Sequence, residues 1–109
     1  MPLYAVFLHH PADQPEGESD EAALAEHDAH GAELSASGRL RFAAPLADPA
    51  ETVSVRGGEV VAGPYTETSE VVVGFYVIEA DDLDAAVAVA RQNPINHQGG
   101  GVEVRPVAG

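Results

Sequence analysis

The pattern of apolar and polar residues along the chain predicts a mixture of strands and helices. Short runs rich in Val, Leu, Phe and Tyr, bounded by Gly, Pro and Asp, are typical of β-strands. Four strands are expected: at residues 3–8, 40–46 and 71–79, and after the glycines that open the segment 99–107. The runs at 3–8 and 71–79 are apolar at consecutive positions, which indicates strands that are buried on both faces.

The first helix is expected between the first two strands. Ser19 or Asp20 can cap its N-terminus, because a short polar side chain accepts hydrogen bonds from the free N–H groups of the first turn. Gly38 supplies the left-handed residue that commonly follows a helix, so the helix should end near Ser37.

The second helix has the clearest periodicity in the chain. Asp81 and Asp84 suit its first turn, where negative charge is favourable. Apolar residues recur at i, i+3, i+4 and i+7, namely Leu83, Ala86, Val87 and Ala90. The helix should end at Asn93–Pro94, because proline lacks the N–H that a continuing helix needs.

These elements predict a single α+β domain over residues 1–109. Their order is βαββαβ, the ferredoxin-like arrangement, with an extra β-hairpin at 52–63 that turns at Gly57–Gly58. Two helices cover only one face of a four-stranded sheet, yet two of the strands are apolar on both faces. We therefore expect a homodimer with sheet packed against sheet. The alternative is that the hairpin folds back over the second face.

Composition restricts the partners of the chain. It has 18 acidic residues, five arginines and no lysine, for a net charge of -13. Such a chain cannot assemble the basic surface that nucleic acid or an anionic membrane requires. Cysteine is absent, which excludes disulfides and thiol chemistry. The N-terminus has neither a signal-peptide pattern nor an apolar run long enough for a membrane span, so a cytoplasmic protein is expected.

His27 is the strongest candidate for chemistry. Leu24, Gly31 and Leu34 define the apolar stripe of the first helix, and His27 falls inside it. An imidazole that faces the sheet can take and return a proton near neutral pH; the alternative is a structural histidine in the core. His30 lies at the edge of the stripe. The two rings could share a metal only with a third ligand that no motif supplies, so no metal is expected. His9 and His10 are expected near the mouth of the site.

A second candidate segment precedes the third long strand. Gly63–Pro64 forms a turn, and Tyr65 presents a ring that can stack on a small molecule. Glu67 and Glu70 point to opposite faces of an extended chain, so only one of them can face a given cleft, and Glu67 is nearer the turn. The segment is either the rim of a binding cleft or a solvated loop. Gly99 to Gly101 precede a strand rather than a helix, and we interpret them as a flexible turn, not a phosphate loop.

Two longer segments resemble a known family. "GPYTETSEVVVGFYVIEADDLDAAVAVARQNP" and "GGGVEVRPV", with His27, Leu34 and Gly38 in the first helix, closely resemble the DGPF-type branch of the YCII-related family over about residues 20–107. The resemblance implies a ferredoxin-like fold and a dimeric α/β barrel. It also implies a site formed by the helix-one histidine, here His27, and by an aspartate before the proline that ends helix two.

This chain departs from the family pattern at two carboxylates. The aspartate before the proline is Asn93, and the Asp-Gly-Pro-Phe signature has become Ala62-Gly63-Pro64-Tyr65. One branch of the family is associated with removing chloride from a chlorinated hydroxyquinone. Glu67 occupies a position that a similar "ETKE"-like run fills in the family, and it could replace the missing aspartate as orienting group or base.

The sequence therefore predicts a small homodimer with a cleft for a cyclic or carbonyl-bearing metabolite. His27 and Glu67 are the expected catalytic groups, and Gly63, Pro64, Tyr65 and Asn93 the expected binding groups. Proton abstraction or elimination without a cofactor is the expected chemistry. The alternative is a non-catalytic ligand-binding or regulatory dimer, which the loss of the two carboxylates favours.

Overall fold

The computed structural model describes residues 2–13, 21–66 and 68–109. Four strands form one antiparallel sheet in the order β2-β5-β1-β6. Their bounds are β1 Leu3–Pro11, β2 Leu40–Pro45, β5 Glu70–Glu79 and β6 Gly101–Pro106. The fold is thus α+β, and the predicted βαββαβ order with an inserted hairpin is confirmed. The central strands β1 and β5 are the two that the sequence marks as apolar on both faces.

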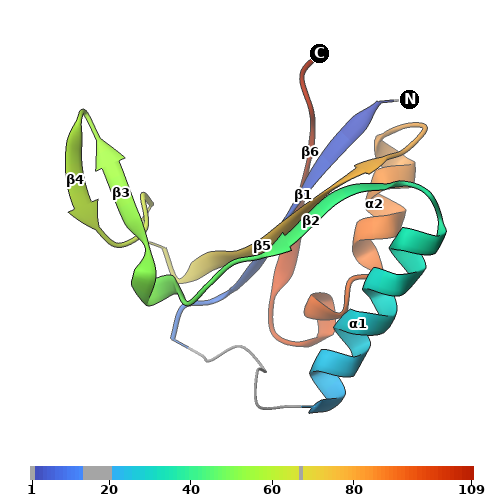
Figure 1. The fold of residues 1–109 in the computed structure, drawn as a ribbon, viewed down its shortest axis with the longest axis horizontal. Helices are drawn as coiled ribbons and strands as arrows, with labels where there is room; N and C mark the ends of the chain where they lie inside the picture. Colours follow the sequence, from blue (N-terminus) through green and yellow to red (C-terminus); the bar gives the residue numbers. More distant parts are fainter. Residues whose placement is uncertain (1, 14–20, 67) are drawn as a thin grey trace.

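Both α-helices lie on the same face of this sheet (Figure 1). Helix α1 spans Glu21–Ala36 and is followed by Gly38 at a φ of 73°, which confirms the predicted left-handed stop. The proposed caps Ser19 and Asp20 lie outside the described residues. No helix in the described part of the chain is long and apolar enough to span a membrane.

Helix α2 spans Leu83–Arg91, and Asp82 caps it by accepting a hydrogen bond from the N–H of Ala85 at 2.8 Å. The predicted end before Pro94 is confirmed. The sequence did not predict the 3-10 helix η2, Pro94–His97, which begins three residues after the end of α2. Asn93 caps η2, because its Oδ1 accepts from the N–H of Ile95 at 3.0 Å.

The core lies between the helices and the sheet. Its buried members are Tyr4, Val6, Leu34, Tyr76, Ile78, Ala80, Ala86 and Ala90. The two buried residues that α2 contributes are Ala86 and Ala90, and the half-buried Ala85 and Val89 pack against the same cluster. The predicted apolar stripe of α2 is correct for Ala86 and Ala90 and wrong for Leu83, which is 46% exposed in the first turn.

The inserted hairpin forms a small sheet of its own. Strands β3 Val53–Arg56 and β4 Glu59–Ala62 pair antiparallel around Gly57 and Gly58, which have positive φ angles of 59° and 87°. Positive φ at both turn residues is the geometry that glycine permits, so the predicted hairpin is confirmed. The hairpin follows the short 3-10 helix η1, Pro49–Glu51, and projects away from the four-stranded sheet (Figure 1). It therefore does not fold back over the second face.

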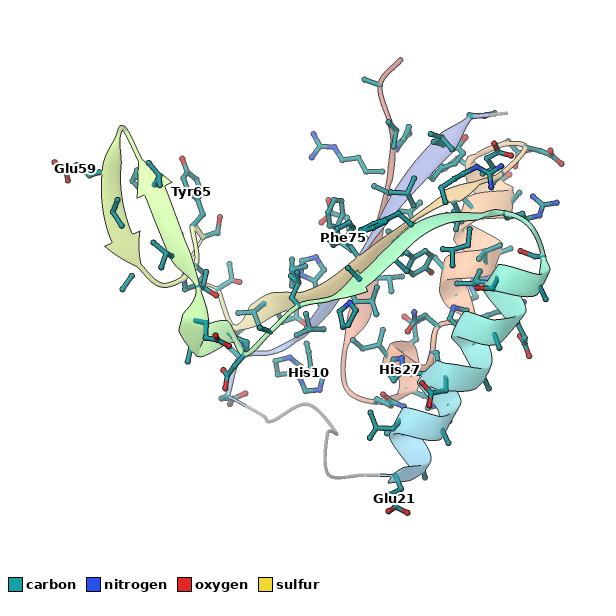
Figure 2. The ribbon with its side chains drawn as sticks, viewed as in Figure 1. His10, Glu21, His27, Glu59, Tyr65 and Phe75 are labelled. Carbon is teal, nitrogen blue, oxygen red and sulfur yellow. The ribbon has the colours of Figure 1, made fainter. Side chains whose placement is uncertain are left out.

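The second face of the sheet carries an apolar surface that the described chain leaves open. Phe7 and Phe75 are directly opposite in the β1–β5 ladder, and so are Phe42 and Val77 in the β2–β5 ladder, which places each pair on one face. The rings of Phe42 and Phe75 lie 5.8 Å apart, and Phe42 is 56% exposed. Phe75 and the helices lie on opposite sides of the sheet in Figure 2.

Of the three glycines before the last strand, Gly99 lies in a turn at a φ of 92°, as expected, whereas Gly100 is a close-packed junction. Gly101 is already part of β6 and pairs with His9 of β1. A Cβ atom on Gly100 would lie 2.2 Å from the backbone oxygen of His9 and 2.8 Å from Cγ1 of Ile95. The absence of a side chain at Gly100 thus allows η2 to pack directly against the end of β1.

Candidate functional site

A cavity of about 450 Å³ lies between α1 and the helix-covered face of the sheet. This volume falls in the range of small-molecule sites. Strands β1, β2 and β5 and the η2 segment form the rest of its wall. Most of the wall is apolar, with Leu8, Leu34, Leu40, Val73 and Ile95 among the contributors. Its polar side chains are His10, His27, Asp28, His30, Tyr76, Asn93 and Gln98.

His27 reaches this cavity from α1 and is half-buried. Its Nε2 lies 2.9 Å from Oε1 of Gln98, a residue 71 positions further along the chain. The Gln98 amide nitrogen faces Oε1 of Glu26 at 3.5 Å, so its carbonyl oxygen is the atom turned toward His27. A carbonyl oxygen only accepts, and His27 Nε2 must therefore carry the proton. In the neutral ring, Nδ1 is then the nitrogen with a free lone pair.

The polar contacts continue from Gln98 to the surface. Glu26 Oε2 lies 2.6 Å from Nε2 of His97, which belongs to η2. Glu26 of α1 thus contacts His97 in η2 and Gln98 directly after it, and these contacts connect η2 to α1. The orientation of the His27 ring therefore depends on the position of η2, because Gln98 directly follows η2.

We expect the contact between His27 and Gln98 to be measurable as a coupling energy. A double-mutant cycle with His27→Leu and Gln98→Leu should give about 0.5–1.5 kcal/mol, the usual contribution of one hydrogen bond. The measurement is urea unfolding of the four proteins. Gln92→Leu provides a control, because Gln92 is an exposed glutamine at the end of α2. A cycle of His27 with Gln92 should give no coupling, and equal coupling in both cycles would contradict the contact.

His30 lies deeper than the sequence suggested. It was expected at the edge of the apolar stripe, but the buried residues of α1 are Ala23, His30 and Leu34, and Leu24 is 48% exposed. The four residues of the predicted stripe, Leu24, His27, Gly31 and Leu34, line the cavity between α1 and the sheet. Burial lowers the pKa of His30; Glu33 raises it in part and His27 lowers it further. His30 is therefore neutral at pH 7.

Tyr76 stands beside His30 in the cavity wall. The two rings meet edge to face with centroids 6.4 Å apart. Burial raises the pKa of Tyr76 to about 12, against a smaller opposing effect of the Asn93 side chain. Asn93 lies near the hydroxyl but not in hydrogen-bonding geometry: in the described part of the chain, neither the Tyr76 hydroxyl nor His30 Nε2 has a hydrogen-bond partner.

The predicted site residues are only partly brought together. His27 and Asn93 both line the cavity, although Asn93 Oδ1 is already occupied in capping η2. Glu67 lies outside the described residues.

Gly63, Pro64 and Tyr65 do not line this cavity. They close the base of the hairpin, where the Gly63 N–H donates to Thr52 at 2.9 Å. Tyr65 is 58% exposed and stacks under the guanidinium of Arg56, 4.0 Å from its ring centroid. Figure 2 shows Tyr65 with the hairpin, well away from His27. The projection of the hairpin separates them.

Three wall residues were missed or undervalued by sequence reasoning. His10 was placed at the cavity mouth, but it is only 6% exposed and lies on the same face of β1 as Tyr4, Val6 and Leu8. Extending the strand alternation by two residues would have found it. Nothing local marks Tyr76 or Gln98, because their roles depend on contacts distant in sequence.

No group of three or more His, Asp or Glu side chains in the described residues is arranged to hold a metal ion. His27 and His30, which share one face of α1, lack a third ligand among these residues. His9 lies on the other face of the sheet, 3.6 Å from Glu103.

Comparison with known proteins agrees with this fold. The solved structure of 5-chloro-2-hydroxyhydroquinone dehydrochlorinase from Burkholderia phenoliruptrix, in complex with 2,5-dihydroxybenzoquinone, is similar with a TM-score of 0.51 and 20% identity. The similarity covers 98% of this chain and 95% of that one, and it concerns the fold alone. An uncharacterized protein of Rhizobium meliloti is 33% identical over 96 residues, 84% of this chain and 77% of the relative. The family model of the YCII-related domain matches residues 3–108. The chain belongs to the YCII-related domain family.

Proposed function

We propose that this YCII-related protein binds a small uncharged metabolite, cyclic or carbonyl-bearing, and that His27 removes a proton from it without a cofactor. The observation that carries the proposal is the His27 ring, which lies in the cavity wall with Nε2 held by Gln98. A ring oriented through one nitrogen keeps the other available as a base. A general base needs both properties, orientation and a free lone pair.

The cavity wall supports an uncharged ligand. No arginine belongs to the wall formed by the described residues, and the chain has no lysine. The one charged side chain in that wall is Asp28, whose carboxylate would repel an anion. The apolar side chains favour a ring by burying its faces.

The fold relative supports the carbonyl-bearing class. That dehydrochlorinase was solved with 2,5-dihydroxybenzoquinone, a ring that carries both hydroxyl and carbonyl oxygens. A carbonyl group acidifies the neighbouring C–H or O–H, so a base of ordinary strength such as imidazole can remove the proton. If the adjacent carbon carries a leaving group, its departure completes an elimination. Glu67 remains our prediction for a second acid-base group.

A non-catalytic binding protein is the second candidate, and a specific observation favours it. The side chain that holds His27 is an amide, and Asn93 is an amide where the family pattern has a carboxylate. A neutral amide stabilises the imidazolium formed after proton transfer less than a carboxylate would. The two candidates differ only in turnover, since both use the same cavity.

Solvent exchange separates the two candidates. The protein is mixed with acetophenone in deuterated buffer, and NMR follows both the protein resonances and the methyl protons next to the ketone. An acid-base enzyme shifts its cavity resonances and exchanges the methyl protons faster than buffer does. Shifts without faster exchange favour the binding protein. If no protein resonance shifts up to the solubility limit of acetophenone, the proposed ligand class is wrong.

We propose further that two chains pack through their open sheet faces to form a cytoplasmic homodimer and a closed barrel. The apolar area around Phe42 and Phe75 supports this, because such surfaces on a sheet usually mark an interface. Phe42→Asp should convert the dimer to a monomer, since it places a charge in the apolar contact. Leu83→Asp is the control, as Leu83 is exposed on α2. Sedimentation equilibrium that gives one mass for the wild type and Phe42→Asp would contradict the interface.

A further inference from the structure

The buried end of the cavity contains two polar atoms that the described chain leaves unpaired. His30 is 8% exposed and Tyr76 is 4% exposed. His30 Nε2 and the Tyr76 hydroxyl have no solvent contact and no hydrogen-bond partner among the described residues. Buried polar atoms in native proteins are nearly always paired, so two exceptions in contacting rings need a reason.

Packing alone does not supply that reason. A phenylalanine would fill the place of Tyr76 in the core without burying a hydroxyl. A leucine in place of His30 would likewise avoid the free-energy cost of burying an unpaired ring nitrogen. Both residues belong to the wall of the same cavity. A ligand oxygen at this end of the cavity would give both atoms a partner once the rings turn toward it.

We propose that His30 and Tyr76 form an oxygen-binding subsite that donates two hydrogen bonds to the carbonyl oxygen of the ligand. The donors are the Tyr76 O–H and the His30 Nε2–H. This inference rests on the proposed function and adds to it the residues that recognise the carbonyl group. His27 and His30 are three residues apart on α1, so the base and the donor are neighbours on one helix face.

Both donors remain protonated and uncharged at neutral pH. Burial raises the pKa of Tyr76 to about 12, which keeps its hydroxyl a donor, and burial lowers the pKa of His30, which keeps its imidazole neutral. A neutral donor does not give up its proton while the negative charge develops on the ligand. The two donors therefore stabilise the oxyanion by hydrogen bonds, and His27 remains the group that transfers the proton.

The subsite gives the proposed reaction a balanced step. His27 Nδ1 takes the proton from the carbon next to the carbonyl, and the electron pair of the broken C–H bond forms a C=C bond. The carbonyl π electrons move to the oxygen, which becomes an enolate held by Tyr76 and His30. Return of a proton or a deuteron from His27 restores the ketone, so no other reactant is consumed.

The test compares two buried tyrosines. Tyr76→Phe removes the hydroxyl from the cavity wall, and Tyr4→Phe removes one from the same core cluster but outside the cavity. Dissociation constants are measured by NMR for acetophenone and for ethylbenzene, a ring of similar shape without oxygen. We expect Tyr76→Phe to weaken acetophenone binding about three- to tenfold and to leave ethylbenzene binding unchanged. Tyr4→Phe should leave both unchanged.

A thermal melt accompanies the titrations. We expect the Tm of Tyr76→Phe to equal or exceed that of the wild type, because the variant loses an unpaired buried hydroxyl. His30→Leu provides a second variant with the same expected loss of acetophenone binding. If Tyr76→Phe and His30→Leu bind acetophenone as the wild type does, the subsite is wrong although the cavity binds ligands. If the wild type binds neither ring, the proposed function fails and the subsite with it.

Discussion

Gly100→Ala is expected to destabilise the protein by about 3 kcal/mol, a large effect for the addition of one methyl group. The new Cβ would meet the backbone oxygen of His9 at 2.2 Å, far inside van der Waals contact. That oxygen belongs to β1, a central strand held by ladders on both sides, so it cannot move aside cheaply. The cost therefore falls on the packing of η2 against β1.

Gly101→Ala is the matched control. Gly101 is the next residue in the chain, and a Cβ there would meet no atom within 4 Å. Its φ is not positive, so alanine is expected to change stability by less than about 1 kcal/mol. Urea unfolding of the three proteins measures the difference. Similar midpoints for both variants would show that Gly100 is not a close-packed junction.

The same variant should disturb the site, because η2 leads directly into Gln98. Ile95 and Gln98 both line the cavity. The N–H of Gly100 donates a hydrogen bond to the backbone oxygen of Ile95 at 3.1 Å, so Gly100 is connected directly to η2. A shift of η2 would move the Gln98 oxygen away from His27. We therefore expect the His27 ring resonances to change in Gly100→Ala and to stay unchanged in Gly101→Ala.

His27→Gln is expected to reduce the exchange of acetophenone methyl protons about 100- to 10,000-fold, the usual contribution of a positioned general base. Glutamine has a similar length and retains hydrogen-bonding atoms, but its amide does not accept a proton near neutral pH. Acetophenone binding should change by less than about threefold, because most of the cavity wall is apolar and remains in place. The expected result is thus lost exchange with retained binding.

His9→Gln is the control for this variant. His9 is a histidine of β1 on the opposite face of the sheet, near Glu103 rather than the cavity. Exchange by His9→Gln should match the wild type. If His27→Gln exchanges protons as fast as the wild type, His27 is not the base, and the non-catalytic candidate is the better description.

The sequence by itself determined most of the secondary structure, because those signals are local. The Gly57–Gly58 turn, the stop at Gly38 and the end of α2 before Pro94 each depend on the backbone preferences of one or two residues. The βαββαβ order of elements along the chain followed from the alternation of strand and helix patterns. Periodicity also identified the face of α1 that carries His27, since four residues of that face line the cavity.

Only the tertiary structure decided which groups meet in the cavity. Gln98 reaches His27 across 71 residues, and this contact depends on how η2 packs against β1 at Gly100. The same holds for the separation of Tyr65 from the site, which follows from the direction in which the hairpin leaves the sheet. Burial of His30 and Tyr76 is likewise a property of the packed layers. Local patterns specify faces and turns, whereas the partners of a buried polar atom are set by segments distant in the chain.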